Sequence, residues 1–219
     1  MSTELYRRSL SAPEDIADWR VEGPMVATFP QGRLRLESAA DPAEGQAANF
    51  VAWLPVEHEG DVRISWGFRP LREPGLAMIF WAARARDGRS IHHPELPART
   101  GEYDQYHSGA IDAYHLSYYR RMWESERSLH TCNVRKSHGF HLVAQGADPL
   151  PAVLDADRDY RLALTWRGPE LTFSIEGIDC LRWIDDGGVG GPARRGGAIG
   201  LRQMAPLIAE YSDLLVEAI

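Results

Sequence analysis

Hydrophobic and polar residues alternate in short runs along most of the chain. In residues 61–69, for example, Val62, Ile64, Trp66 and Phe68 are separated by charged or small residues. Because successive side chains of a β-strand point to opposite faces, this pattern predicts a strand with one face buried. Residues 76–83 are apolar almost throughout, which predicts a central strand covered on both sides.

The same patterns predict about twelve strands and only one or two short helices, one of them within residues 12–20. The predicted strands cover residues 25–29, 33–37, 49–54, 61–69, 76–83, 114–121, 131–135, 140–144, 160–166, 171–175, 198–204 and 211–218. Many short strands with a turn about every 8 to 12 residues are typical of an antiparallel β-sandwich. The length favours a jelly roll with a concave sheet. We therefore expect one all-β domain over residues 1–219, with a partly irregular segment at 1–24.

Two of these strands carry polar side chains on one face. If the face with Leu116 and Val134 is buried, the strands over 114–121 and 131–135 present a polar face together. Its members are His115, Ser117, Tyr119, Asn133 and Arg135. The strand over 198–204 adds Arg202 by the same alternation, and Trp81 joins this face if Met78 and Phe80 are buried.

These residue types are suited to acid–base chemistry on a sugar. His115 could act as the base, because histidine titrates near neutral pH, and Tyr119 as the acid. Asn133, Arg135 and Arg202 could hold a carboxylate or hydroxyl groups, with Ser117 and Trp81 beside them. The alternative is an ordinary solvated sheet face.

A long polar segment, residues 86–108, connects two of the predicted strands. Loops of this length inside a compact domain are often functional. Its possible metal ligands, with one from the following strand, are His92, His93, Asp104, His107 and Asp112. These side chains could bind a divalent cation, although no ligand motif with close spacing is present, and the sequence indicates no other cofactor. Tyr103, Tyr106, His107 and Trp123 could instead stack on sugar rings.

Paired carboxylates for glycoside hydrolysis are not evident. Asp112 and Asp213 are isolated in the sequence, whereas glycosidases need two acids across the cleaved bond. The glycine-rich stretch GGVGGPARRGG at 187–197 lacks the Lys-Ser/Thr ending of a phosphate loop, and we interpret it as a turn.

The charge and composition exclude several classes of partner. The net charge of −7, without a basic stripe, argues against nucleic acid. No apolar run approaches the roughly 18 residues of a membrane span, and the N-terminus lacks the apolar core of a secretory signal. Cys132 and Cys180 are too few for a disulfide framework, so free thiols and a cytoplasmic location are expected.

Three segments resemble a bacterial group, the YesU-like proteins of unknown function. They are YHLSYYRR at 114–121, CNVRKSHGFHLVAQGADPLP at 132–151 and GGAIGLRQMAPLIAEYSDLLV at 196–216. The resemblance extends from about Gly32 onward. It implies a concanavalin A-like, galectin-like jelly roll and a carbohydrate context, since such proteins often occur with enzymes of pectin and rhamnogalacturonan use. It implies no catalytic residue.

The leading functional hypothesis is a carbohydrate-active enzyme that cleaves a small acidic or modified oligosaccharide or glycoside by β-elimination. The first alternative is a non-catalytic, lectin-like sugar-binding module, and the second is a glycoside hydrolase that uses Asp112 or Asp213. In each case the partner is a saccharide, with no nucleic acid and no membrane. Pairing of sheet edges could also produce a homodimer.

Overall fold

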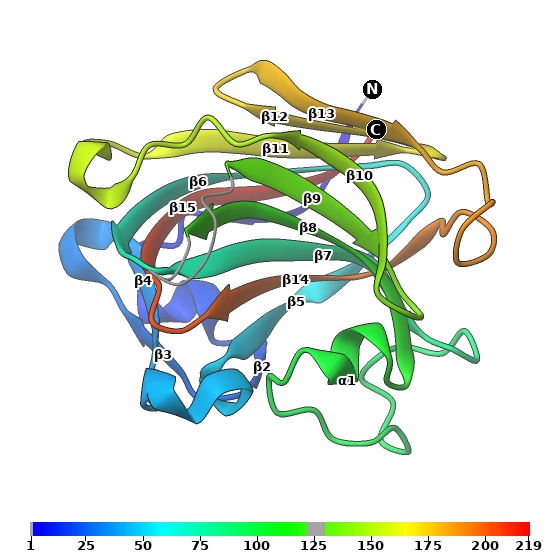
Figure 1. Cartoon of the computed structure of the whole chain (residues 1–219), viewed down its shortest axis with the longest axis horizontal. Coiled ribbons are helices and arrows are strands. Elements are labelled where there is room, and N and C mark those ends of the chain that lie inside the picture. The colour runs from blue at the N-terminus through cyan, green and yellow to red at the C-terminus, as the bar shows by residue number, and fades with distance from the viewer. Residues whose placement is uncertain (1, 122–129) are drawn as a thin grey trace.

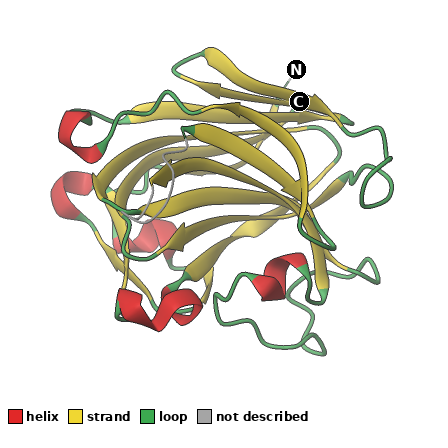
Figure 2. Ribbon diagram, viewed as in Figure 1, coloured by secondary structure: helices red, strands yellow, loops and turns green. Residues whose placement is uncertain are grey.

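Two antiparallel β-sheets stack face to face in the computed structural model, which describes residues 2–121 and 130–219 (Figures 1 and 2). Trp123, a predicted stacking residue, lies outside the described residues. The first sheet pairs its strands in the order β13-β12-β11-β6-β15-β4-β3, and β1 also pairs with β15. The bounds of these strands are β1 Thr3–Arg8, β3 Met25–Thr28, β4 Leu34–Ser38, β6 Val62–Arg72, β11 Tyr160–Arg167, β12 Glu170–Ile175, β13 Ile178–Ile184 and β15 Ile208–Ala218.

The second sheet has seven strands in the order β10-β9-β8-β7-β14-β5-β2. Their bounds are β2 Arg20–Glu22, β5 Phe50–Glu59, β7 Gly75–Ala85, β8 Ile111–Arg121, β9 Thr131–Lys136, β10 His141–Ala147 and β14 Gly196–Met204. As predicted, β7 is a central strand and almost every residue in it is buried. Figure 1 shows the strong curvature of this sheet.

The space between the sheets is filled mainly by aromatic and branched side chains. All four apolar residues predicted for the strand over 61–69 are buried there. Trp66, Phe68, Tyr118 and Phe173 meet across the two sheets, and the contacting pairs have ring centroids 5.2 to 6.4 Å apart. Such pairs contribute about 0.5–1.5 kcal/mol each beyond the area that they bury. The alternation over residues 61–69 therefore identifies the buried face of β6 correctly.

The helices are short. Four are 3₁₀ turns, at Pro13–Ile16, Pro30–Gly32, Pro42–Ala48 and Val153–Asp155, and α1 spans Asp104–His107. None of the helices within residues 2–121 and 130–219 is long and apolar enough to cross a membrane. The all-β prediction is confirmed, and the first of these turns lies inside the helix predicted at 12–20.

Three strands were not predicted. β1, β2 and β13 lie at the edges of the sheets and keep many side chains exposed, so they lack the apolar alternation that marks a half-buried strand. β1 and β2 give regular structure to part of residues 1–24, the segment predicted to be partly irregular.

Candidate functional site

The segment between β7 and β8, residues 86–110, folds over the outer face of the seven-stranded sheet. Figure 1 shows α1 and its flanking loops beside the ends of these strands. A second apolar cluster holds the segment in place, with Trp53, Phe80 and Tyr106 at its centre. The rings of these three residues lie 5.5 to 6.3 Å apart. The long loop predicted to be functional is therefore a packed cover on the sheet.

Polar contacts fix the position of this cover. The Tyr106 hydroxyl donates to Glu22 at 2.7 Å, and Arg99 pairs with the same carboxylate at 2.6 Å. Gly101 has a φ of +99°, and a Cβ there would overlap the carbonyl oxygen of Asn49. Tyr106 was predicted to bind substrate. Because its ring is fully buried and its hydroxyl is engaged, it instead supports the cover.

Tyr103, at the start of α1, forms a hydrogen bond with His115 below it, and the distance from its hydroxyl to His115 Nδ1 is 2.7 Å. On the other side of the ring, His115 Nε2 lies 3.5 Å from Ser137 Oγ. Ser137 donates its own hydrogen to the carbonyl of Tyr106, so it can only accept from His115. His115 therefore carries its proton on Nε2, and Tyr103 donates to Nδ1.

Burial and nearby cations keep this histidine neutral. His115 is 1% exposed, and its ring stacks on Phe80 at 5.4 Å. Desolvation, with the charges of His107, Arg135 and Arg202, lowers the pKa of His115 well below its ordinary value of 6.5. Burial also raises the pKa of Tyr103. Neither group is charged near neutral pH.

Arg202 projects from β14 onto the same outer face, as predicted, but it is fully buried. Its guanidinium donates to the carbonyl of Gly101 and, at 3.3 Å, to Gln46 Oε1. It also lies 4.9 Å from the centre of the Tyr103 ring. Burial lowers the pKa of Arg202 to about 10, which leaves it charged at neutral pH. Arg202 therefore positions Tyr103 from below and is out of reach of a substrate.

Above these buried residues lies an open hollow of about 410 Å³, which we call the Tyr103 hollow. It is lined by Gln46, Glu102, Tyr103, Asp104 and His107. No hydrogen bond from the described residues engages the Asp104 carboxylate, so this acceptor is available to a ligand. The lining thus combines one aromatic face with amide, imidazole and carboxylate groups.

An exposed aromatic residue extends this site. Phe140, which follows β9, is 49% exposed, and its ring lies 5.5 Å from Tyr103 and 4.8 Å from His107. The Arg135 guanidinium lies 3.6 Å above the Phe140 ring and donates to the Phe140 carbonyl at 3.0 Å. Arg135 is half-buried and so remains partly accessible, as a substrate-holding residue must be.

The other polar side chains of the predicted face lie farther along the strands. Ser117 is almost buried, and its hydroxyl donates to the Asn133 carbonyl at 3.5 Å. The Asn133 side chain accepts from Gln145 on β10 at 2.8 Å. Ser117 and Asn133 share the outer face of the sheet with His115, but neither of them lines the Tyr103 hollow.

Two residues predicted for this face lie on the opposite one. A bulge in the pairing of β8 with β7 brings Tyr119 into the core between the sheets, where it packs on Phe68 and donates to Glu73. Trp81 is also in that core, 5.1 Å from Tyr114, because Met78 and Phe80 take the outer face. The predicted pair of His115 as base and Tyr119 as acid therefore does not form.

The predicted metal ligands and acids do not converge. Within the described part of the chain, no three His, Cys, Asp or Glu side chains come together as a metal site. His92 lines a separate hollow with Arg20 and Arg99, away from Asp104 and His107, and His93 bonds Arg89 at 2.9 Å. Asp112 and Asp213 belong to different sheets, so they form no catalytic pair.

Comparison with known proteins places the chain in a family. Residues 3–216 match a domain of unknown function, DUF1961. The chain belongs to the DUF1961 family. It is 45% identical to the uncharacterized protein YesU of Bacillus subtilis over 212 residues, which cover 97% of this chain and 94% of YesU. The predicted resemblance to YesU-like proteins is thereby confirmed.

Solved structures confirm the galectin-like fold. A Bacillus subtilis protein of unknown function with a galectin-like fold superposes with a TM-score of 0.92 at 45% identity, covering 99% of this chain and 97% of that one. The carbohydrate binding module CBM66 of Bacillus subtilis has a TM-score of 0.56 at 12% identity, covering 92% and 96%. At this low identity, the second similarity shows the fold alone.

Sequence reasoning missed part of the hollow. It treats Tyr103 only as a stacking side chain and gives Gln46, Glu102 and Phe140 no role. The aromatic and acidic composition of residues 102–107 was the available signal. The sequence contains no sign that Gln46, more than fifty positions away, meets them.

Proposed function

We propose that the protein binds a saccharide in the Tyr103 hollow, on the outer face of the seven-stranded sheet. The observation that carries this proposal is the contact of three rings, Tyr103, His107 and Phe140, at the edge of a hollow lined by hydrogen-bonding groups. The name of the structural neighbour CBM66, a carbohydrate binding module, supports the same class of ligand for this fold.

The residues match the two kinds of surface that a sugar presents. The C–H face of a pyranose ring packs on an aromatic ring, and Phe140 is exposed enough to receive it. Hydroxyl groups need acceptors and donors, which Asp104, Glu102 and His107 provide. Arg135 stands beside Phe140 and would add an ion pair if the sugar carried a carboxylate.

Calorimetric titration with cellobiose, N,N′-diacetylchitobiose and digalacturonate tests this proposal. We expect at least one of these saccharides to bind. Phe140→Ala should weaken that binding about five- to tenfold, because a stacked aromatic ring contributes on the order of 1 kcal/mol. Leu154→Ala is the control, because Leu154 is another exposed hydrophobic side chain, with 98% of its surface exposed. This substitution should leave the affinity for the saccharide unchanged. Equal affinities of the wild type and Phe140→Ala would contradict the proposal.

Elimination is a second candidate, favoured by the hydrogen bond between Tyr103 and His115. The Tyr103 oxygen would take the C5 proton of a uronate as its own proton moves to His115 Nδ1. The proton would return through Tyr103 to the leaving oxygen as the C4–O bond breaks. Desolvation and, after it, nearby positive charge lower the pKa of His115, and a substrate carboxylate bound near Arg135 would offset part of that charge.

The product of elimination has a double bond conjugated to a carboxylate, which ultraviolet absorbance detects. Digalacturonate should yield this signal with the wild type and with Tyr119→Phe, and not with Tyr103→Phe. Tyr119 is the matched control because its hydroxyl lies in the core. Binding without product, or product from Tyr103→Phe, would rule out elimination by this pair and leave the binding proposal in place.

We also propose that the protein works in the cytoplasm. The free state of Cys132 and Cys180 supports a reducing compartment.

A further inference from the structure

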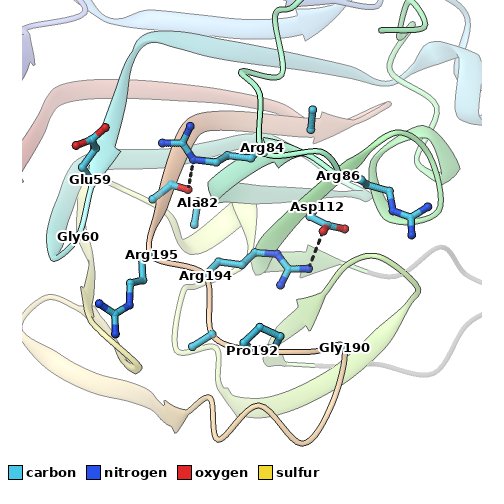
Figure 3. Close-up of a pocket in the computed structure, with 14 residues that line it drawn as sticks. Glu59, Gly60, Ala82, Arg84, Arg86, Asp112, Gly190, Pro192, Arg194 and Arg195 are labelled. Carbon is cyan, nitrogen blue, oxygen red and sulfur yellow. Dashed lines mark hydrogen bonds and ion pairs between the residues drawn. The ribbon is translucent and has the colours of Figure 1, made fainter.

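A second hollow, of about 520 Å³, opens beside the ends of β7 and β8 (Figure 3). The turn between β5 and β6 and the glycine-rich segment 190–196 form its other walls. Its charged lining consists of Glu59, Arg84, Arg86, Asp112, Arg194 and Arg195. We call it the Arg194 hollow. The stretch interpreted from sequence as a simple turn therefore contributes two arginines to a cavity.

The charge of this hollow is opposite to that of the whole chain. It has four guanidinium groups against two carboxylates, in a protein with a net charge of −7. Small residues, among them Ala82, Ala85 and Gly196, leave room between the charged groups. Planar guanidinium groups match carboxylate and phosphate oxygens in pairs. The hollow therefore suits an anion.

Two arginines are held in place by the fold. Arg84 donates to the Gly196 carbonyl at 3.0 Å, which fixes it on one wall. Arg194 donates from its backbone to the Tyr114 hydroxyl at 2.8 Å, and its side chain donates to the Ser137 carbonyl. The guanidinium of Arg194 also lies 3.5 Å from Asp112 Oδ2 (Figure 3). These contacts place a donor and an acceptor next to each other inside the hollow.

The remaining hydrogen-bonding capacity of that pair points to a ligand. Asp112 Oδ1 and Arg194 Nε are buried and have no hydrogen-bond partner among the described residues. Buried polar atoms are rarely left unpaired. Arg194 Nε needs an acceptor such as a carboxylate oxygen, whereas Asp112 Oδ1 needs a donor such as a hydroxyl.

Two further arginines are free to close on a ligand. Arg86 and Arg195 are exposed, and no side-chain partner holds either of them within residues 2–121 and 130–219. Figure 3 places them on either side of Arg194. They can therefore supply long-range attraction and contacts at the rim.

We propose that the Arg194 hollow binds a hydroxylated carboxylate, that is, a sugar acid. The arginines would hold its carboxylate, and Asp112 would accept from a neighbouring hydroxyl. This site is separate from the Tyr103 hollow and does not depend on the function proposed there. Asp112 and His115 lie on opposite faces of β8, because they are an odd number of residues apart.

Titration of the full-length protein with D-glucuronate tests this site, with acetate, D-glucose and glucose 6-phosphate as comparison ligands. We expect glucuronate to bind about tenfold or more tightly than acetate or glucose. Acetate lacks the hydroxyl groups that Asp112 would bind, and glucose lacks the carboxylate that the arginines would bind. Added salt should weaken the binding. Tighter binding of glucose 6-phosphate than of glucuronate would overturn the assignment to a carboxylate.

Substitutions identify which part of the protein binds glucuronate. Arg86→Gln combined with Arg195→Gln should weaken glucuronate about three- to tenfold, as expected for exposed charged contacts. Arg63→Gln changes an exposed arginine of the other sheet and should have no effect. Loss of glucuronate binding with Phe140→Ala, without a loss in the Arg86/Arg195 double variant, would place glucuronate in the Tyr103 hollow and overturn the proposal. Absence of glucuronate binding, or an equal loss with Arg63→Gln, would overturn the proposal.

Discussion

His115 shows how a residue can be placed on the correct face by pattern while its contacts remain unpredicted. Alternation along β8 puts it on the outer face, where it is found. The sequence could not reveal that Tyr103 would cover it, because that contact depends on how residues 86–110 fold back over the sheet. Arg202 is covered for the same reason. Both residues lie beneath the Tyr103 hollow, which we propose as the saccharide site.

The neutral state of His115 predicts how stability depends on pH. Its folded pKa is depressed, so the unfolded chain binds more protons once the pH falls below the ordinary value of 6.5. The free energy of unfolding should therefore decrease between about pH 6.5 and the lower folded pKa, by up to about 1.4 kcal/mol per pH unit.

Urea unfolding at about pH 7 and pH 5 measures this effect. The measurement compares the wild type with His115→Gln. His58 is also buried and has a lowered pKa, but it contributes the same pH dependence of stability to both proteins. The variant should lose less stability on acidification than the wild type. Equal losses would show that His115 has no depressed pKa in the folded protein.

At the scale of elements, the two wrong assignments have different causes. Tyr119 was assigned by strict alternation, but the register of β8 with β7 shifts between Ala77 and Met78, where β8 has one extra residue. A bulge of this kind reverses the faces of the residues beyond it. Trp81 keeps the alternation of β7, but that apolar run has no polar side to show which face is outward. Sequence pattern alone cannot locate either feature.

The cover formed by residues 86–110 depends on close backbone contact at Gly101. Gly101→Ala should destabilise the protein by on the order of 2 kcal/mol more than Gly177→Ala, as judged by chemical denaturation. Both glycines have positive φ, at +99° and +77°, but only Gly101 lacks space for a Cβ. Equal effects of the two substitutions would mean that the cover does not rest tightly on β5.

At the scale of the molecule, the two hollows lie on opposite faces of β8, so we expect ligands to bind them independently. The antiparallel β-sandwich was predictable because twelve amphipathic or apolar strands leave few alternatives. Its galectin-like form was expected only from the resemblance to YesU-like proteins. The two sites were only partly predictable, since each joins side chains from distant segments, such as Gln46 with Tyr103 and Glu59 with Arg194. The predicted homodimer stays a prediction.

The most direct test of saccharide binding is to map amide chemical shifts by NMR during titration with the saccharide that calorimetry identifies. We predict that the largest changes fall within residues 102–107 and at Arg135 and Phe140. Changes confined to the other sheet, or to the Arg194 hollow, would contradict binding at the Tyr103 hollow.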